Sequence, residues 1–394
     1  MKIIHTDNNF TVSNLEYLDV PILLNNQMEI VKPVFRFIIY LVIQDGRIQS
    51  KKTIKSYALA LYDYFSFLEA NELNWDEPYL NDSQHFSISA VALYRNWSRS
   101  LLKNNGQRAV SDSTINLRLS GLKRFYEYCY SVGLISFEPW ETLFKVQTEI
   151  VPSFLSHTRG QKIVKSNDLV LKTFKVPPKM ISLEQCKQLI CSINNKTLKL
   201  MTKLILATGL RKDELISFER RYLFEPNMRR FDMRIPIDLV PSKTGQRTKG
   251  SKPRRIFVSA PLMRELWDHI HFGEGVSRAN KFKSRYGYDS PFVFLNRFGE
   301  PYSEAGLNNA YRKLYTGAKK KIDFKVSPHM LRHTYATIEL YSESQRTNIA
   351  AALTWIKERL GHSSIVTTSV YLHCIESLQE HELSTYQNEL DAME

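Results

Sequence analysis

Three short stretches of this chain carry side chains that could act together on a phosphodiester. Arg211 lies in the first, His329 and Arg332 lie in the second, and His362 and Tyr371 lie in the third. Arginine suits a phosphate because its planar guanidinium binds two non-bridging oxygens and stays protonated. A tyrosine hydroxyl can attack phosphorus, but it ionises at about pH 10 in water and therefore needs cationic neighbours. The set predicts metal-independent cleavage of a nucleic-acid backbone.

The spacing suggests a role for each group. We expect Arg211 and Arg332 to hold the scissile phosphate while charge builds on it in the transition state. His329 lies three residues before Arg332, so the two share a face of a predicted helix. His329 could there bind the phosphate or accept the tyrosine proton. His362 follows a turn at Gly361 and is expected to donate to a non-bridging oxygen.

A further group must protonate the leaving 5′ oxygen. Lys243 is the preferred candidate because it lies in a basic, glycine-containing segment, residues 242–250, between two predicted strands. Lys249 is the alternative, since the sequence does not fix the boundary of the turn. Glu214 is expected to orient its helix or neighbouring groups, and His333 to make a structural hydrogen bond.

Each of these residues has an ordinary structural explanation when it is taken alone, as a surface arginine, a core tyrosine or an exposed lysine. Their order is more informative. Arg, then His-x-x-Arg, then Leu-Gly-His, then Tyr resembles the tyrosine recombinases, the phage integrase family, from about residue 31 to residue 383. Ser-Lys-Thr-Gly around Lys243 and the acidic residue Glu214 also resemble the pattern of that family.

The resemblance implies both a fold and an activity. The fold would be mainly α with a small antiparallel β-sheet, in which a helical SAM-like core-binding domain and an α+β catalytic domain clamp double-stranded DNA. The activity would be site-specific recombination by an integrase, a transposase or an Xer-type enzyme. Tyr371 would form a 3′-phosphotyrosyl link and free a 5′-hydroxyl, without metal, ATP or another cofactor. Four protomers would exchange strands through a Holliday junction.

Two other functions would use the same fold. A type IB topoisomerase shares the chemistry but rejoins the original strand as a monomer, and a catalytically silent relative would only bind DNA. A helical N-terminal domain and an acidic C-terminal segment favour the recombinase over the topoisomerase. Because every catalytic position is filled, the sequence argues against the silent relative.

The charge balance agrees with a polyanionic partner. The 394 residues include 54 Lys and Arg against 40 Asp and Glu, a net charge of +14, which favours nucleic acid or an anionic membrane surface. The longest apolar run, residues 35–43, is too short to span a bilayer, and the first residues lack the apolar core of a secretory signal. We therefore expect a DNA partner and a cytoplasmic location, with no membrane association. The four cysteines lack the spacing of a metal site and predict reduced, mostly buried thiols: Cys129, Cys186, Cys191 and Cys374.

Hydrophobic periodicity predicts the elements that must position these groups. The expected divisions are an N-terminal segment 1–30, a helical DNA-binding domain 31–143, a linker 144–178, a catalytic domain 179–373 and an acidic tail 374–394. Helices are predicted near residues 53–68, 91–101, 111–129, 198–207, 260 onward and 303–319, and strands at 234–241 and 255–258. Ser182 and Gln185 form a capping-box pattern at the start of the catalytic domain.

Basic residues recur on the predicted N-terminal helices and on the hairpin, where phosphate contact is expected. The residues chosen as DNA contacts are Lys51, Lys52, Lys55, Arg118, Lys123, Arg124, Arg247 and Lys249. Residues 273–289 and 342–347 make the chain longer than the family pattern. Residues 376–394 contain six acidic side chains and no Lys or Arg, and we expect this tail to form a helix that docks on a neighbouring protomer.

Overall fold

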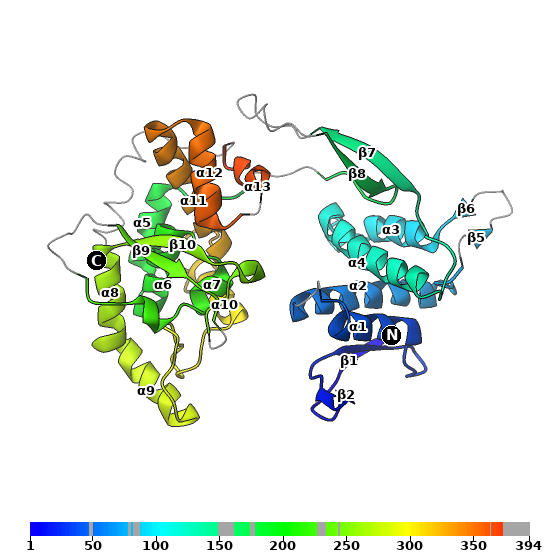
Figure 1. The fold of residues 1–394 in the computed structure, drawn as a ribbon, viewed down its shortest axis with the longest axis horizontal. Coiled ribbons are helices and arrows are strands. Elements are labelled where there is room, and N and C mark those ends of the chain that lie inside the picture. The colour runs from blue at the N-terminus through cyan, green and yellow to red at the C-terminus, as the bar shows by residue number, and fades with distance from the viewer. Residues whose placement is uncertain are drawn as a thin grey trace. The chain divides into compact units, whose positions relative to one another are not determined.

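The computed structural model describes residues 1–46, 50–77, 80–81, 87–148, 161–173, 178–226, 234–242, 245–362 and 364–372. The chain folds into two compact units (Figure 1), one of Met1–Ile150 with Thr158–Lys175 and the other of Val151–His157 with Val176–Glu394. Helices dominate both units, and the sheets are small antiparallel pairs, as the sequence predicted. In the described part of the chain, no helix is both long enough and apolar enough to cross a membrane.

Four helices build the first unit. They are α1 (Lys32–Ile43), α2 (Lys51–Ala70), α3 (Ala90–Ser100) and α4 (Asp112–Ser131). The last three match the predicted helices, and Ser111 caps α4 by accepting from the Thr114 amide. The aromatic side chains on their inner faces form the core, where the hydroxyl groups of Tyr64 and Tyr126 lie 2.7 Å apart.

Short strands complete this unit. In the N-terminal segment, β1 (Lys2–His5) pairs with β4 (Pro21–Leu24), and β2 (Thr11–Val12) pairs with β3 (Leu15–Glu16). Val20 and Leu23 enter the helical core, which gives the segment a packing role. A two-residue pair joins β5 (Leu80–Asn81) to β6 (Ser87–Ile88). Strands β7 (Thr142–Thr148) and β8 (Gln161–Asn167) pair antiparallel, largely within the expected linker.

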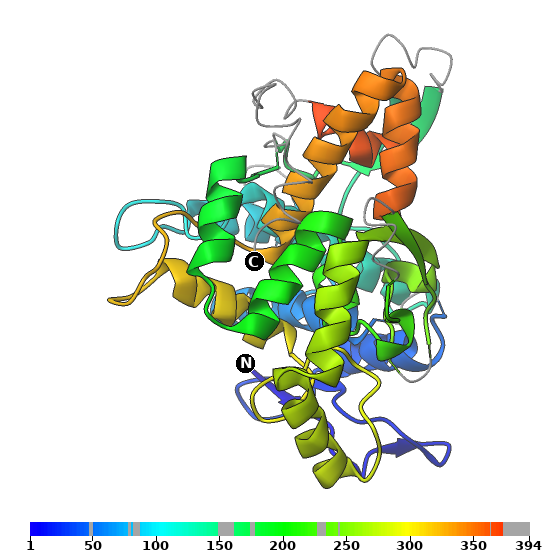
Figure 2. The same cartoon turned by 90° about the vertical axis from the view of Figure 1, so that its left-hand side faces the viewer.

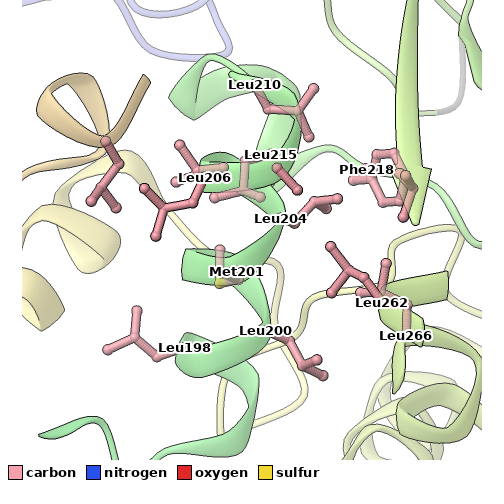
Figure 3. Packing of buried hydrophobic residues seen from close by; sticks show 14 of the residues in the cluster. Leu198, Leu200, Met201, Leu204, Leu206, Leu210, Leu215, Phe218, Leu262 and Leu266 are labelled. Carbon is pink, nitrogen blue, oxygen red and sulfur yellow. The ribbon is translucent and has the colours of Figure 1, made fainter. Parts of the chain in front are cut away.

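The second unit is organised around a helix that is buried on nearly every side. This helix, α6 (Lys196–Thr208), places Leu198, Met201 and Leu204 among the side chains in Figure 3. Around it lie α5 (Leu183–Ser192), which has the predicted capping box, α7 (Lys212–Ile216), α8 (Ala260–His271), α9 (Glu274–Tyr286) and α10 (Glu304–Tyr315). Strands β9 (Arg234–Leu239) and β10 (Arg254–Ser259) form the predicted antiparallel pair.

Three further helices carry or precede the residues of the last two motifs chosen from the sequence. Helix α11 (Pro328–Arg346) lies beside α12 (Ile349–Leu360) in Figure 2, and α13 (Ile365–Ser369) follows α12. A separate apolar cluster joins them and contains Leu353, Leu360 and Tyr371. Residues 342–346 form the last turns of α11, and residues 274–286 form α9, which Figure 1 places at the opposite end of this unit from α11–α13.

Cysteine burial follows the sequence prediction in part. Cys129 and Cys186 are buried in the two cores, whereas Cys191 is exposed. Cys374 and the acidic tail lie outside the described residues.

Candidate active site

Arg211 is placed by a sharp reversal at the end of α6. Gly209 ends the helix in the left-handed region, with φ of 61°, a conformation that glycine adopts without steric cost. A Cβ there would lie 2.3 Å from Cδ1 of Tyr335. The reversal makes Arg211 the N-cap of α7, and the Gly209 carbonyl accepts a hydrogen bond from Nη1 of Arg332. Two motifs far apart in the sequence therefore meet at this turn.

Glu214 is a completely buried carboxylate that binds two guanidinium groups. It accepts from the amide of Arg211 (2.8 Å) and from Nη1 of the same residue (3.0 Å). Its other partner is Arg254, whose Nη2 lies 2.5 Å from Oε2. Burial would raise the pKa of Glu214, but Arg254 and then Arg211 hold it below its ordinary value. The expected orienting role of Glu214 is therefore supported by its contacts.

Arg254 was not among the residues chosen from the sequence. It lies beside Arg255 on β10, and the alternation of a strand points only one of the two inward. Arg255 pairs on the exposed face with Asp238, whereas the Arg254 side chain is 4% exposed. The alternating apolar pattern of β10 is the only sequence signal that could have separated these neighbours.

Three guanidinium groups converge on the C-terminal end of α12. Carbonyl groups at a helix C-terminus lack partners within the helix and carry partial negative charge, so they attract cations. The donor and acceptor pairs are Arg254 with the Arg359 carbonyl, Arg332 with the Leu360 carbonyl (2.8 Å) and Arg211 with the Gly361 carbonyl (3.0 Å). The structure thus brings the two predicted phosphate ligands together directly before His362.

His362 is held as a neutral imidazole in one tautomer. Its Nε2 lies 3.3 Å from Nη2 of Arg332, and its Nδ1 lies 3.0 Å from Oγ1 of Thr368. Because a guanidinium only donates, Nε2 must accept and Nδ1 must carry the proton. Burial, with Arg332 and Arg211 nearby, lowers the pKa of His362 to about 3. In this tautomer His362 supports Arg332, so donation to a phosphate, as predicted, requires a second proton or the other tautomer.

Tyr371 lies next to the histidines, but its ring is buried. The side chain is 2% exposed, and its ring stacks on that of His362 with the planes 11° apart. The hydroxyl lies 3.0 Å from Nδ1 of His333. Burial, and then His329 and Arg332, lower the pKa of His333 to about 4, so this ring is neutral at pH 7. The residue assigned only a structural hydrogen bond is therefore the histidine that contacts the phenol.

His329 lies one turn before His333 on α11. Their ring centroids are 4.1 Å apart, and His329 keeps an exposed edge. Partial burial and then Arg332 and Arg211 lower its pKa. His329 is therefore close enough to Arg332 and Arg211 to feel their charge. His333, and not His329, is the histidine that contacts Tyr371.

The segment that carries the candidate lysines is anchored to α7 and to Glu219, just beyond it. Ser242 Oγ donates to Glu219 (2.7 Å), and the buried amide of Gln246 donates to the Glu214 carbonyl (3.3 Å). Lys243 itself lies outside the described residues, between these two anchors. Lys249 is exposed at the start of a short 3-10 helix, Lys249–Ser251.

Several predicted DNA contacts have ion-pair partners within their own unit. Lys55, Arg118 and Arg124 each lie 2.5 Å from a carboxylate, those of Asp19, Asp63 and Asp45. Lys123 lies 3.8 Å from Glu127, and Arg247 lies 3.9 Å from Asp213. Lys51 and Lys52 are exposed at the start of α2. The paired cations have a structural role in addition to any contact with phosphate.

Comparison with known proteins gives two family matches. The model described as the phage integrase family matches residues 179–377, and the model of the phage integrase N-terminal SAM-like domain matches residues 34–133. The first match covers the catalytic motifs up to Tyr371.

Named relatives are similar over most of the chain. Transposase A from transposon Tn554 of Staphylococcus aureus is 24% identical over 377 residues, 93% of either chain. Tyrosine recombinase XerC of Listeria monocytogenes serotype 4b is 25% identical over 356 residues, 87% of this chain and 97% of XerC.

Solved structures share the fold. The XerH site-specific recombinase bound to palindromic difH substrate matches with a TM-score of 0.51 and 17% identity, over 82% of this chain and 77% of that one. The Tn1549 transposon integrase in complex with a circular intermediate DNA matches with a TM-score of 0.51 and 16% identity, over 91% and 99%.

Proposed function

This chain belongs to the phage integrase family of tyrosine recombinases, enzymes that cut and rejoin DNA, and we propose that Tyr371 is its nucleophile. The phenol oxygen forms a bond to the scissile phosphorus while the bond to the 5′ oxygen breaks, which leaves a 3′-phosphotyrosyl link. The 5′-hydroxyl of a partner strand then attacks that link and releases the tyrosine. Because each step exchanges one phosphodiester for another, no external energy source is needed.

The observation that supports this proposal most strongly is the convergence at the end of α12. Arg211 and Arg332 donate to neighbouring carbonyl groups there, so their positions are fixed relative to each other before a phosphate arrives. Preorganised donors of this kind stabilise charge as it develops in a transition state. Arg211 keeps 22% of its side chain exposed, which leaves part of its guanidinium accessible to DNA.

The remaining groups handle protons. His333 accepts the phenol proton, since its Nδ1 already lies 3.0 Å from the Tyr371 hydroxyl and its ring is neutral at pH 7. Lys243, or Lys249 in its place, protonates the leaving 5′ oxygen. His329 donates to the phosphate from the exposed edge of α11.

Attack requires a movement of Tyr371. The ring is buried against His362, so it must shift toward the DNA, and His333 takes the phenol proton as the oxygen approaches phosphorus in line with the leaving group. Helix α13 has only five residues, and its displacement with Tyr371 would disturb the small apolar cluster of α11–α13 and the hydrogen bond between Thr368 and His362. We infer that DNA bound by the arginines favours this displacement.

Double-stranded DNA is the proposed partner. The net charge of +14 and the DNA bound in the similar structure of the Tn1549 integrase support it, and the basic N-terminal helices would contact phosphates. Both units would contact the duplex, in the cytoplasm of the host cell.

The decisive experiment traps the covalent intermediate. Nicked duplexes drawn from DNA that flanks the gene are incubated with the wild type and with Tyr371→Phe, and adducts are resolved on a denaturing gel. The wild type should form an adduct and release a 5′-hydroxyl, while Tyr371→Phe should bind the same DNA without forming one. An adduct that survives this substitution would exclude Tyr371. Relaxation of supercoiled DNA without strand transfer between duplexes would identify a topoisomerase instead.

We further propose a tetramer in which the acidic tail docks on a neighbouring protomer. Its six acidic side chains and its leucines support the docking role. Deletion of residues 376–394 should abolish synapsis of two duplexes but leave adduct formation on a nicked site. Unchanged recombination by the truncated enzyme would reject the role of the tail.

A further inference from the structure

Arg254 links three elements of the catalytic unit without being exposed. It extends from β10 to Glu214 on α7 and to the carbonyl of Arg359 on α12. Its Nε has no hydrogen-bond partner among the described residues, so two contacts from its two Nη groups hold the guanidinium. A lysine could not make both contacts in the same geometry, because its charge is concentrated on a single nitrogen.

Glu214 links Arg254 to Arg211, so that a change in the position of Arg254 would change the position of Arg211. One carboxylate oxygen lies 2.5 Å from Arg254, and the other lies 3.0 Å from Nη1 of Arg211. A buried carboxylate that loses one of two cationic partners reorganises around the other. The guanidinium of Arg211, which the Gly361 carbonyl also fixes, would then be pulled from its place.

The end of α12 transmits the position of Arg254 to Arg332. Arg254 and Arg332 donate to the successive carbonyl groups of Arg359 and Leu360. A Cβ on Gly361 would lie 3.1 Å from Cδ of Arg254, so the arginine also packs directly beneath the turn that precedes His362. Both predicted phosphate ligands therefore depend on groups that Arg254 holds.

We propose that Arg254 is a positioning residue, which sets Arg211 and Arg332 at the spacing that a scissile phosphate requires and never contacts DNA itself. This inference rests on the proposed function, in which those two arginines bind the phosphate. It deepens that function by adding a third, buried arginine to the site.

The proposal predicts a defect that depends on the charge of the phosphate. Charge develops on the non-bridging oxygens of an ordinary phosphodiester, and the two guanidinium groups stabilise it. A methylphosphonate replaces one such oxygen with a methyl group, so less charge develops and misplaced arginines matter less. A general loss of folding would instead reduce cleavage of both substrates equally.

The test compares Arg254→Lys with Arg255→Lys on two nicked duplexes that differ only at the scissile group. Arg255 is the matched control because it occupies the exposed face of the same strand and pairs only with Asp238 among the described residues. Arg254→Lys should slow first-turnover cleavage of the phosphodiester by roughly 100-fold, as a misplaced catalytic group does. The rate at which Arg254→Lys cleaves the methylphosphonate should stay within roughly threefold of the wild-type rate, because less charge develops for the arginines to stabilise. Arg255→Lys should match the wild type on both.

A second variant keeps the test independent of one substitution. Glu214→Asp keeps the charge but shortens the side chain, so it cannot span Arg211 and Arg254, and it should show the same dependence on substrate. Equal losses on the two substrates, or full activity of Arg254→Lys, would overturn the proposal. If the wild type forms no adduct with either duplex, the proposed function itself fails, which separates the two conclusions.

Discussion

The guanidinium of Arg332 lies 3.3 Å from Nε2 of His362, and its charge opposes protonation of that imidazole. Burial, together with Arg254 and Arg211, lowers the pKa of Arg332 to about 9, so it remains charged at pH 7. That charge contributes to the low pKa of His362. The proposed phosphate-binding centre therefore combines charged Arg332 with the neutral imidazoles of His333 and His362.

Stability should decrease in mild acid. The pKa values of His269 and His333 are lowered to about 4 and that of His362 to about 3, against an ordinary value of 6.5. Below pH 6.5 the unfolded chain takes up protons that the folded chain excludes, so the free energy of unfolding falls as the pH approaches 4. Urea titrations at pH 7 and pH 5 should show this loss. His269→Gln, which lies outside the active site, should reduce the dependence, and equal stability at the two pH values would contradict the prediction.

Glu214→Gln should both destabilise and inactivate the enzyme. The amide keeps the shape but leaves the buried Arg254 without its carboxylate, and breaking a buried pair costs about 3 kcal/mol or more. Chemical denaturation should detect this decrease in the free energy of unfolding. Asp213→Asn, on the partly exposed position next to it, is the matched control and should cost less than about 1 kcal/mol. Similar costs for both variants would show that the buried pair adds little.

The general acid can be identified with a leaving group that needs no proton. A 5′-bridging phosphorothiolate expels a thiolate, whose conjugate acid has a pKa of about 8.5. Lys243→Met should slow cleavage of the ordinary substrate by roughly 100-fold, within the usual contribution of acid catalysis, and cleavage of the thiolate substrate should be restored. Lys249→Met should cleave both substrates normally. Restoration for Lys249→Met alone would assign the role to Lys249.

Gly209→Ala should destabilise the catalytic unit more than a comparable change elsewhere. The left-handed backbone and the approach of Tyr335 to 2.3 Å together predict a loss of about 3 kcal/mol. Gly250 has a similar φ of 69° but no heavy atom within 4 Å, so Gly250→Ala should cost only about 1 kcal/mol. Thermal unfolding of both variants measures the difference. Equal costs would mean that Tyr335 moves aside easily.

Most secondary structure was predictable because local patterns determine it. The helices α2, α3 and α4 and the strands β9 and β10 follow periodicity and caps that are visible in the sequence. The order of the proposed catalytic residues could also be chosen from the sequence, since it is a set of residue types and spacings. The pairing of β7 with β8 was missed because both strands lie in a segment without clear periodicity.

Partners that are distant in sequence were not predictable. Arg118 and Arg124 were chosen as DNA contacts, but they meet Asp63 and Asp45, which lie 55 and 79 residues away. On α11, His329 and His333 both flank Arg332, and spacing alone could not decide which ring faces Tyr371. Arg254 was missed because it and Arg255 are neighbours on one strand, and their residue type alone does not show which of the two points inward.

The shared attachment at the end of α12 ties the groups of the proposed catalytic centre to one another. The same few peptide groups hold Arg211, Arg332 and the turn before His362. A shift of these peptide groups would therefore move all three together. A neighbouring subunit or a regulator that tilted α12 slightly would displace all of these groups from their active positions. Cleavage activity would then be switched on or off as a whole, and the protein that controls it would not need to contact DNA.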